Sequence, residues 1–224
     1  IVSYDPAWPQ MFEEEATIIR QALGENCVAI HHIGSTAVPG LCAKPVIDMI
    51  PVVLDIRKVD QATENMQSLG YEARGEFGML FRRFFFKEDV ARNIHVFEQG
   101  NPEIERHLKF RDWMRAHEDD RKAYGALKQE LALNYQNDRE AYCFGKEAFI
   151  VDIDTKTGFR GLRIVHALTP REWDAICIFR NKNFFDKIPM VDSYTWTFDH
   201  KDHAHLVLCQ GTNIIGYSHI QLWP

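Results

Sequence analysis

The residues with the clearest capacity for chemistry lie in one short stretch of this 224-residue chain. Gly34, Ser35 and Thr36 directly follow an apolar run, and Lys44 and Asp48 come shortly afterwards. A glycine after a strand lets the chain turn sharply, so that hydroxyl and backbone N–H groups can face a phosphate. Lys44 would add a positive point charge to such a site. These residue types in this order are typical of a phosphate-binding turn.

Asp48 is the only acidic residue in the two apolar runs that flank this turn. An unpaired buried carboxylate costs several kcal/mol, so Asp48 must lie at a strand end, have a partner or face a cleft. Two interpretations follow. One is a tight turn with a structurally paired aspartate, and the other is a phosphate site in which the aspartate holds a metal ion. The spacing alone does not separate them.

The elements that must position these residues follow from the apolar periodicity. Apolar residues at helical spacing predict helices over 6–23, 58–69, 102–114, 119–135 and 138–151. Short apolar, aromatic or β-branched runs predict strands over 28–33, 46–53, 79–87 and 93–98. The charged turn at 88–89 makes the last two strands an antiparallel hairpin, and Asp138 is a predicted helix N-cap. The turn with Gly34 therefore joins two predicted strands.

The character of the sequence changes near residue 158. The helical pattern lapses over 156–161, and we predict a first domain over 1–157 and a second over 158–224. In the second domain Thr169, Pro170 and Glu172 predict a capped helix start. The predicted strands there cover 162–168, 194–199, 205–210 and 214–223, the last three as consecutive hairpins.

Residues 32–48 resemble the signature segment of the GrpB family (UPF0157). The likeness covers residues 1 to about 155 and includes Tyr4-Asp5-Pro6-Ala7-Trp8, the pair Arg82-Arg83, the run 93–96 and the segment 138–149. The resemblance implies an α/β (α+β) fold, namely a nucleotidyltransferase-like mixed sheet followed by helices. In such folds a Gly-Ser turn lies against a triphosphate, and two or three carboxylates hold divalent metal ions, here Mg²⁺ or Mn²⁺.

The sequence departs from that pattern at two positions. Ile50 stands where a second acid is expected after Asp48, and the later strand offers His95 rather than an acid. Asp48 and His95 are the candidate catalytic residues, and Asp48 is the candidate metal ligand. The incomplete set leaves three functions open: a nucleotidyltransferase-like enzyme, a nucleotide-binding or regulatory module without catalysis, and an oligomerisation partner.

The candidate phosphate- or nucleotide-binding residues are of three kinds: residues of the turn, residues with a positively charged side chain, and a tyrosine. They are Gly34, Ser35, Thr36, Lys44, Arg82, Arg83, Lys128, Tyr142 and Lys146. Arg82 and Arg83 are neighbours on a strand, so only one can face Asp48. Tyr142 and Lys146 are four apart on a helix, as are Lys128 and Tyr124. Each pair could reach a phosphate, or each lysine could simply pack its stem on a tyrosine at the surface.

The second domain is similar in its order of elements to the first half of a GNAT-type N-acetyltransferase. The supporting segment is the turn at 211–216 before the last strand. The resemblance implies acetyl-CoA as a ligand only if the Gly-rich loop that follows the next strand is present. Because the sequence ends before that loop, we expect either a longer natural protein or a homodimer that pairs the exposed C-terminal strand edge. His200, His203 and His205 lie near a turn, but their spacing does not favour zinc.

Composition limits the partners. The formal net charge of −6 and the pI of 5.9 argue against wrapping nucleic acid by bulk electrostatics. The five cysteines form no CxxC pair, and no apolar run is long enough to cross a membrane. We expect a cytoplasmic protein whose ligand is a nucleotide or a phosphorylated small molecule.

Overall fold

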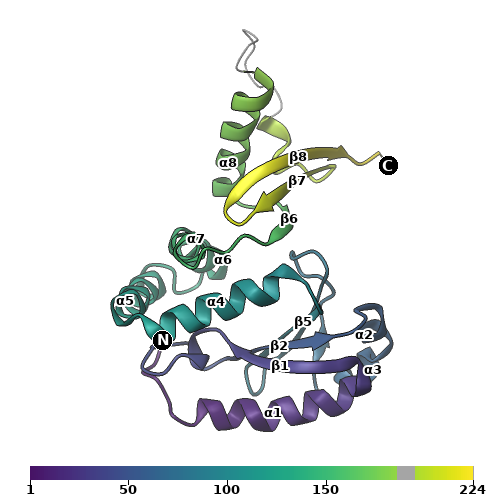
Figure 1. Cartoon of the computed structure of the whole chain (residues 1–224), viewed down its shortest axis with the longest axis vertical. Coiled ribbons are helices and arrows are strands. Elements are labelled where there is room, and N and C mark those ends of the chain that lie inside the picture. Colours follow the sequence, from purple (N-terminus) through teal and green to yellow (C-terminus); the bar gives the residue numbers. More distant parts are fainter. Residues whose placement is uncertain (186–194, 224) are drawn as a thin grey trace. The chain divides into compact units, whose positions relative to one another are not determined.

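The computed structural model describes residues 1–185 and 195–223 (Figure 1). The chain forms two compact units. Unit 1 comprises Ile1–Phe77 and Phe81–Phe159, and unit 2 comprises Gly78–Leu80 and Arg160–Pro224. Each unit has its own sheet.

Unit 1 is built on a mixed five-stranded sheet. Its strands are β1 (Cys27–Ile33), β2 (Ile47–Val53), β3 (Glu72–Ala73), β4 (Arg82–Lys87) and β5 (Arg92–Glu98). They lie in the order β1-β2-β5-β4-β3. Only β2 and β5 run parallel, and the other pairs are antiparallel. The predicted mixed α/β fold is confirmed, and β2, whose apolar residues are buried on both faces, lies inside the sheet between β1 and β5.

Helices cover both faces of this sheet (Figure 1). Helix α1 (Trp8–Leu23) lies on one face, where Trp8, Phe12 and Ile19 join the larger core. Helix α4 (Pro102–Ala116) lies on the opposite face. A second core of Val38, Leu41, Met114, Tyr124 and Ile153 connects the turn after β1 with the later helices. The turn that carries Ser35 is therefore fixed by packing on both sides.

The remaining helices of unit 1 differ from the prediction mainly in their breaks. Their bounds are η1 (Gly24–Asn26), η2 (Ser35–Ala37), α2 (Arg57–Gln61), α3 (Thr63–Ser68), α5 (Glu118–Asn134), α6 (Arg139–Phe144) and α7 (Glu147–Lys156). The predicted helix 58–69 is interrupted at Ala62, and the predicted helix 138–151 is interrupted at Gly145. A Cβ at Gly145 would approach Leu131, so the glycine allows α6 to pack closely on α5. Asp138 caps α6 as predicted.

Unit 2 contains a three-stranded antiparallel sheet in the order β6-β7-β8. Its elements are β6 (Leu162–His166), α8 (Pro170–Arg180), the π-helix η3 (Asn181–Phe185), the 3₁₀ helix η4 (Thr195–Thr197), β7 (His203–Gln210) and β8 (Asn213–Gln221). The capping box of Thr169 and Glu172 at α8 is confirmed.

The predicted strand at 194–199 is wrong. Residues 195–197 form η4, and residue 194 lies outside the described residues. Strand β7 pairs with β6 on one edge and with β8 on the other, so it has no free edge for this segment. Thr197 instead turns inward, where its hydroxyl contacts His205 Nε2 at 3.0 Å.

Among residues 1–185 and 195–223, no helix has the length and apolar character needed to cross a membrane.

Candidate phosphate site around Asp48

Asp48 lies at the beginning of β2, with β1 on one side and β5 on the other. It is paired with Ile33 on β1 and with Asn93 on β5. Gly34 has a φ of 71°, and a Cβ added there would lie 2.6 Å from Asp48 Oδ2. Both the left-handed backbone and the close approach of the carboxylate require glycine. The turn and the aspartate are therefore direct neighbours.

Two side chains on β5 approach the same carboxylate oxygen. Asn93 Nδ2 donates a hydrogen bond to Asp48 Oδ1 at 2.7 Å. His95 Nε2 lies 3.7 Å from that oxygen. Asn93 and His95 are two apart, so strand alternation places both on one face. The sequence run 93–96 carried this alternation, but Asn93 itself was not among the predicted site residues.

Arg82 fixes the tautomer of His95. Its Nη1 lies 3.0 Å from His95 Nδ1, while its other nitrogens donate to the carbonyls of Glu76 and Phe77. A guanidinium can only donate, so His95 Nδ1 must accept and the ring proton must be on Nε2. Burial lowers the pKa of Arg82 to about 10, and the Glu103 carboxylate raises it. His95 therefore presents an N–H to Asp48, at a separation of 3.7 Å that is longer than a hydrogen bond.

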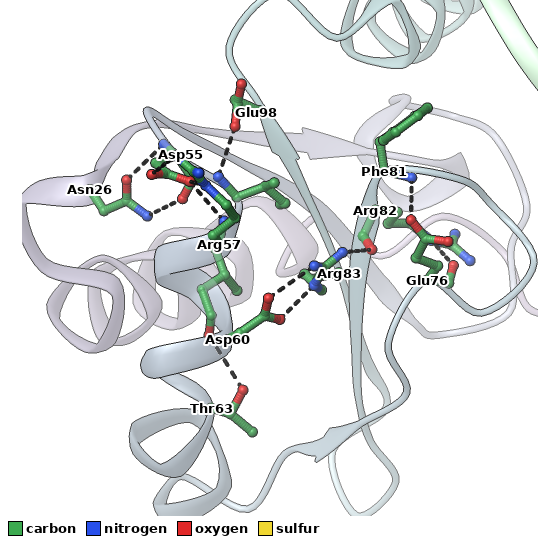
Figure 2. A network of polar contacts seen from close by, with 12 residues as sticks. Asn26, Asp55, Arg57, Asp60, Thr63, Glu76, Phe81, Arg82, Arg83 and Glu98 are labelled. Carbon is green, nitrogen blue, oxygen red and sulfur yellow. Dashed lines mark hydrogen bonds and ion pairs between the residues drawn. The ribbon is translucent and has the colours of Figure 1, made fainter.

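Arg83 lies on the opposite face of β4 and does not join this site. Its Nε and Nη2 donate to the two carboxylate oxygens of Asp60 at 2.6 and 2.9 Å, as Figure 2 shows. The Asp60 carboxylate raises the pKa of Arg83. Of the two predicted arginines, the structure therefore brings only Arg82 toward Asp48, through His95.

Lys128 reaches the turn from α5. Its side chain is 2% exposed, and its Nζ donates to Ser35 Oγ at 2.8 Å and to the Cys42 carbonyl. The Nζ also lies 4.8 Å from the centre of the Tyr124 ring. Burial lowers the pKa of Lys128 to about 8, with Cys42 raising it and the charge of Lys146 lowering it. A buried amine with this pKa is partly neutral in mildly alkaline solution.

Lys44 and Lys146 share the ring of Tyr142. Their Nζ atoms lie 4.1 and 4.6 Å from its centre. Burial lowers the pKa of Lys146, Asp48 is among the groups that raise it, and Lys44 is among those that lower it. Burial also raises the pKa of Tyr142 to about 12. We call Lys44, Lys128 and Lys146 the lysine cluster, because Lys44 acts electrostatically on Lys146 and Lys146 acts on Lys128, while Asp48 acts on Lys146.

A divalent cation would find few ligands here. Within residues 1–185 and 195–223, no three His, Cys, Asp or Glu side chains are grouped to hold a metal ion. The oxygen donors at the site are the Asp48 carboxylate and Asn93 Oδ1, which is buried without a hydrogen-bond partner. Mg²⁺ is commonly held by one or two carboxylates together with substrate phosphates. The residues fit a cation that arrives with a phosphate ligand.

The comparisons with known proteins agree with the sequence resemblance. Residues 1–156 match the family model described as GrpB protein. The chain belongs to the GrpB family. It is 43% identical over 152 residues to UPF0157 protein YqkA of Bacillus subtilis, a match that covers 67% of this chain and 44% of YqkA. The chain thus matches less than half the length of that relative.

Two further relatives are covered more fully. UPF0157 protein BH1888 of Halalkalibacterium halodurans is 39% identical over 154 residues, which cover 68% of this chain and 79% of that protein. The crystal structure of conserved protein GrpB from Enterococcus faecalis is 40% identical, with a TM-score of 0.67. That match covers 70% of this chain and 95% of the other.

Within unit 1, the side chain of Thr36 makes different contacts from that of its neighbour Ser35. It is 1% exposed, its hydroxyl donates to the Val46 carbonyl at 3.2 Å, and His32 Nε2 lies 3.0 Å from the same oxygen. Burial lowers the pKa of His32 to about 4, so its ring is neutral at pH 7. Thr36 therefore ties the turn to the start of β2, whereas the half-buried Ser35 hydroxyl faces Lys128.

Proposed function

We propose that unit 1 binds a nucleotide or another phosphate-bearing small molecule at the Gly34–Ser35 turn. The observation that carries this proposal is the lysine cluster, in which Lys128 contacts Ser35 of the turn and the charge of Lys146 acts on both Lys128 and Asp48. The whole chain has a formal net charge of −6, so this local excess of positive charge runs against its overall balance. An anionic ligand would compensate that excess.

Burial and mutual repulsion of lysines disfavour their charged forms, as the lowered pKa values of Lys128 and Lys146 indicate. A phosphate placed beside Lys146 would restore its charged form and form charge-assisted hydrogen bonds. Ser35 would supply a hydroxyl to the same ligand. The site therefore gains more from a phosphate than an exposed lysine pair would.

We propose Mg²⁺ or Mn²⁺ as a companion of the phosphate ligand, held by Asp48 and Asn93. Such a cation would neutralise phosphate charge and orient the phosphate oxygens. Ile50 and His95 supply no further acid, and His95 presents an N–H rather than a free electron pair to Asp48. These residues favour ligand binding over two-metal nucleotidyl transfer, which is the alternative function.

Thermal unfolding of the full chain tests this function. Nucleoside triphosphates and inorganic pyrophosphate, each with and without Mg²⁺, are added in series. A ligand at a hundred times its Kd adds about 2.7 kcal/mol to the free energy of unfolding, which raises the Tm. The absence of a Tm shift with every phosphate ligand, in either metal condition, would contradict the proposal.

For unit 2 we propose that it is part of an acetyl-CoA-dependent acetyltransferase in a longer chain. The support is its order of elements, in which the capped helix α8 follows β6 and precedes the β7–β8 hairpin. The coding sequence after residue 224 tests this, because a further strand followed by a Gly-rich helix start is required. A coding sequence without that motif would contradict the proposal.

Two further proposals concern the surroundings of the protein. The edge strand β8, with Ile215 and Ile220 exposed, would pair with a second copy of the chain to form a homodimer. Size-exclusion chromatography with light scattering measures this directly, and a monomer at all concentrations would contradict it. We also propose a reducing cytoplasmic location, because the five cysteines of the sequence are scattered without a CxxC pair.

A further inference from the structure

The contact between Ser35 and Lys128 has the geometry of a nucleophile and its base. Ser35 Oγ is half-buried and lies 2.8 Å from Lys128 Nζ. An activated serine needs a base within about 2.6–3.2 Å of its hydroxyl. The 2% exposed Lys128 meets that requirement from a position that water scarcely reaches.

The backbone presents Ser35 on a sharp turn. Strand β1 ends at Ile33, Gly34 takes a φ of 71°, and Ser35 begins the 3₁₀ helix η2. The Thr36 hydroxyl bonds to the Val46 carbonyl and holds the turn against β2. A nucleophile mounted on a tight, anchored turn after a strand is held in one orientation toward its substrate.

A third group orients the amine. Lys128 Nζ donates one hydrogen bond to the Cys42 carbonyl. In the neutral amine this leaves one N–H group and the electron pair, and the electron pair can accept the proton of Ser35. In the part of the chain that the structure describes, no carboxylate forms an ion pair with Lys128. The titratable groups that act on it are Cys42 and Lys146, and its ammonium group lies over the ring of Tyr124 on α5.

A base works best when its pKa is near the pH at which it acts. Burial lowers the pKa of Lys128 to about 8, so a large fraction of the amine carries a free electron pair at pH 8. A surface lysine would be almost fully protonated at that pH. Both the position and the protonation of Lys128 therefore suit proton removal from Ser35.

We propose that Ser35 is a nucleophile and Lys128 its general base, and that unit 1 thereby hydrolyses an activated ester. This activity goes beyond phosphate binding. Lys44 and Lys146 favour an ester whose leaving group carries a phosphate, and this detail alone rests on the proposed phosphate site.

The reaction balances with water as the second reactant. Ser35 Oγ forms a bond to the acyl carbon while its proton moves to the Lys128 amine. The bond from carbon to the leaving oxygen then breaks, and that oxygen takes the proton from Lys128. Water next attacks the acyl-serine, its proton passes through Lys128 to Ser35 Oγ, and the carboxylic acid leaves. Serine and amine are both restored.

A fluorophosphonate probe tests the nucleophile on the full chain. Ser35 Oγ would form a bond to phosphorus and fluoride would leave, so the peptide that contains Ser35 would gain the mass of the phosphonyl group. The labelling rate should increase as pH rises through about 8, because the neutral amine is the active form of Lys128. Ser35→Ala should remove the label, and Ser68→Ala, an exposed serine in the same unit, should retain it.

Lys128→Arg separates a base from a structural anchor. Arginine keeps the positive charge and the hydrogen bonds but cannot accept a proton at these pH values. Labelling should fall at least about tenfold in a variant whose circular dichroism and Tm stay close to wild type. If this variant misfolds, the probe rate of the wild-type chain between pH 7 and 10 provides the test, because a rate without the rise near pH 8 overturns the proposal.

Two other results would overturn the proposal: no label on Ser35 in the folded wild-type chain, or a wild-type labelling rate in folded Lys128→Arg. Phosphate binding is read out separately by the thermal shift with pyrophosphate. A chain that is labelled at Ser35 but shows no Tm shift with pyrophosphate would contradict the phosphate site and support the nucleophile. A chain that shows the Tm shift but no label would support the phosphate site and contradict the nucleophile.

Discussion

Two groups of charged side chains in unit 1 differ in charge balance. In the first, Arg106 donates to Asp154 at 2.7 Å and lies 3.4 Å from Glu103, and we call these three residues the carboxylate–arginine network. Burial opposes the charge of Arg106, yet the two carboxylates raise its pKa. In the lysine cluster the charges are mainly of one sign, and burial lowers the pKa of Lys128 and Lys146.

This difference separates scaffold from site. A buried cation with its own carboxylates is satisfied within the fold, so it connects α4 to α7 and needs no ligand. Buried cations that outnumber their carboxylates keep an unused capacity for an anion. The number of buried charges is therefore less informative than whether each one has an internal partner.

The largest expected effect breaks the balanced network. Asp154→Ala removes the shorter of the two ion pairs of Arg106, and removing one partner of a buried ion pair costs about 3–5 kcal/mol of unfolding free energy. Urea unfolding measures this loss. Asp152→Ala on the same helix removes an exposed partner of Lys156 and should cost less than about 1 kcal/mol. Equal losses in the two variants would contradict the structural role of the network.

His107 contacts Glu103 of the carboxylate–arginine network and should make unit 1 sensitive to acid. Its Nδ1 donates to the Glu103 carbonyl at 2.7 Å, and its ring centre lies 6.2 Å from that of His95. Burial lowers the pKa of His107 to about 4, against 6.5 in the unfolded chain. The unfolded state therefore binds more protons between these values, so stability should fall as pH decreases from about 6.5 to 4.

The size of this acid effect can be isolated by substitution. His107→Gln keeps a donor for the Glu103 carbonyl but removes the titration. The loss of unfolding free energy between pH 6.5 and 4 should therefore be smaller in this variant than in wild type, by up to about 3 kcal/mol. His117→Gln is the matched control, since the exposed His117 contacts the Trp113 carbonyl in the same way. An unchanged slope in His107→Gln would show that this ring does not titrate in that range.

Asp48→Asn should weaken ligand binding with little loss of stability. The substitution keeps the shape of the side chain and removes the negative charge that would hold a cation. Metal-dependent nucleotide affinity should fall at least about tenfold, or roughly 1.4 kcal/mol, in titration calorimetry. A loss of about 3–5 kcal/mol in stability with unchanged affinity would instead place Asp48 with the structural network.

The smallest expected effect concerns one member of the lysine cluster. Lys146→Gln should lower the affinity for pyrophosphate by about three- to tenfold, because one charge-assisted contact is worth about 1 kcal/mol. Removing the repulsion from Lys146 should also raise the pKa of Lys128. Lys122→Gln changes an exposed lysine on α5 that pairs with Glu118 and should leave the affinity unchanged. Equal affinities in both variants would contradict the role of the lysine cluster.

Much of the site was predictable because its residues are close in the sequence. A strand, a glycine turn and a second strand follow each other within residues 27–53, and the antiparallel pairing of β1 with β2 then places Gly34 against Asp48. Strand alternation likewise separates Arg82 from Arg83. Asn93 was missed because an asparagine in a strand gives no signal until the parallel neighbour of that strand is known.

The prediction of a strand at 194–199 shows the limit of local pattern. Aromatic and polar residues alternate there as in an edge strand, but both edges of β7 are already occupied by β6 and β8. The residue pattern of a segment predicts which of its faces could be buried. Whether a partner strand is available depends on the rest of the sheet.

By itself, the sequence determined the family, the mixed sheet, and the turn that places glycine and serine beside an aspartate. These depend on local periodicity and on the backbone freedom of glycine, which near neighbours in the chain decide. Only the tertiary structure decided which cations meet that turn. Lys128 contacts Ser35 from 93 residues away, and packing of α5 on the turn both brings the two together and excludes the water that would keep the amine charged.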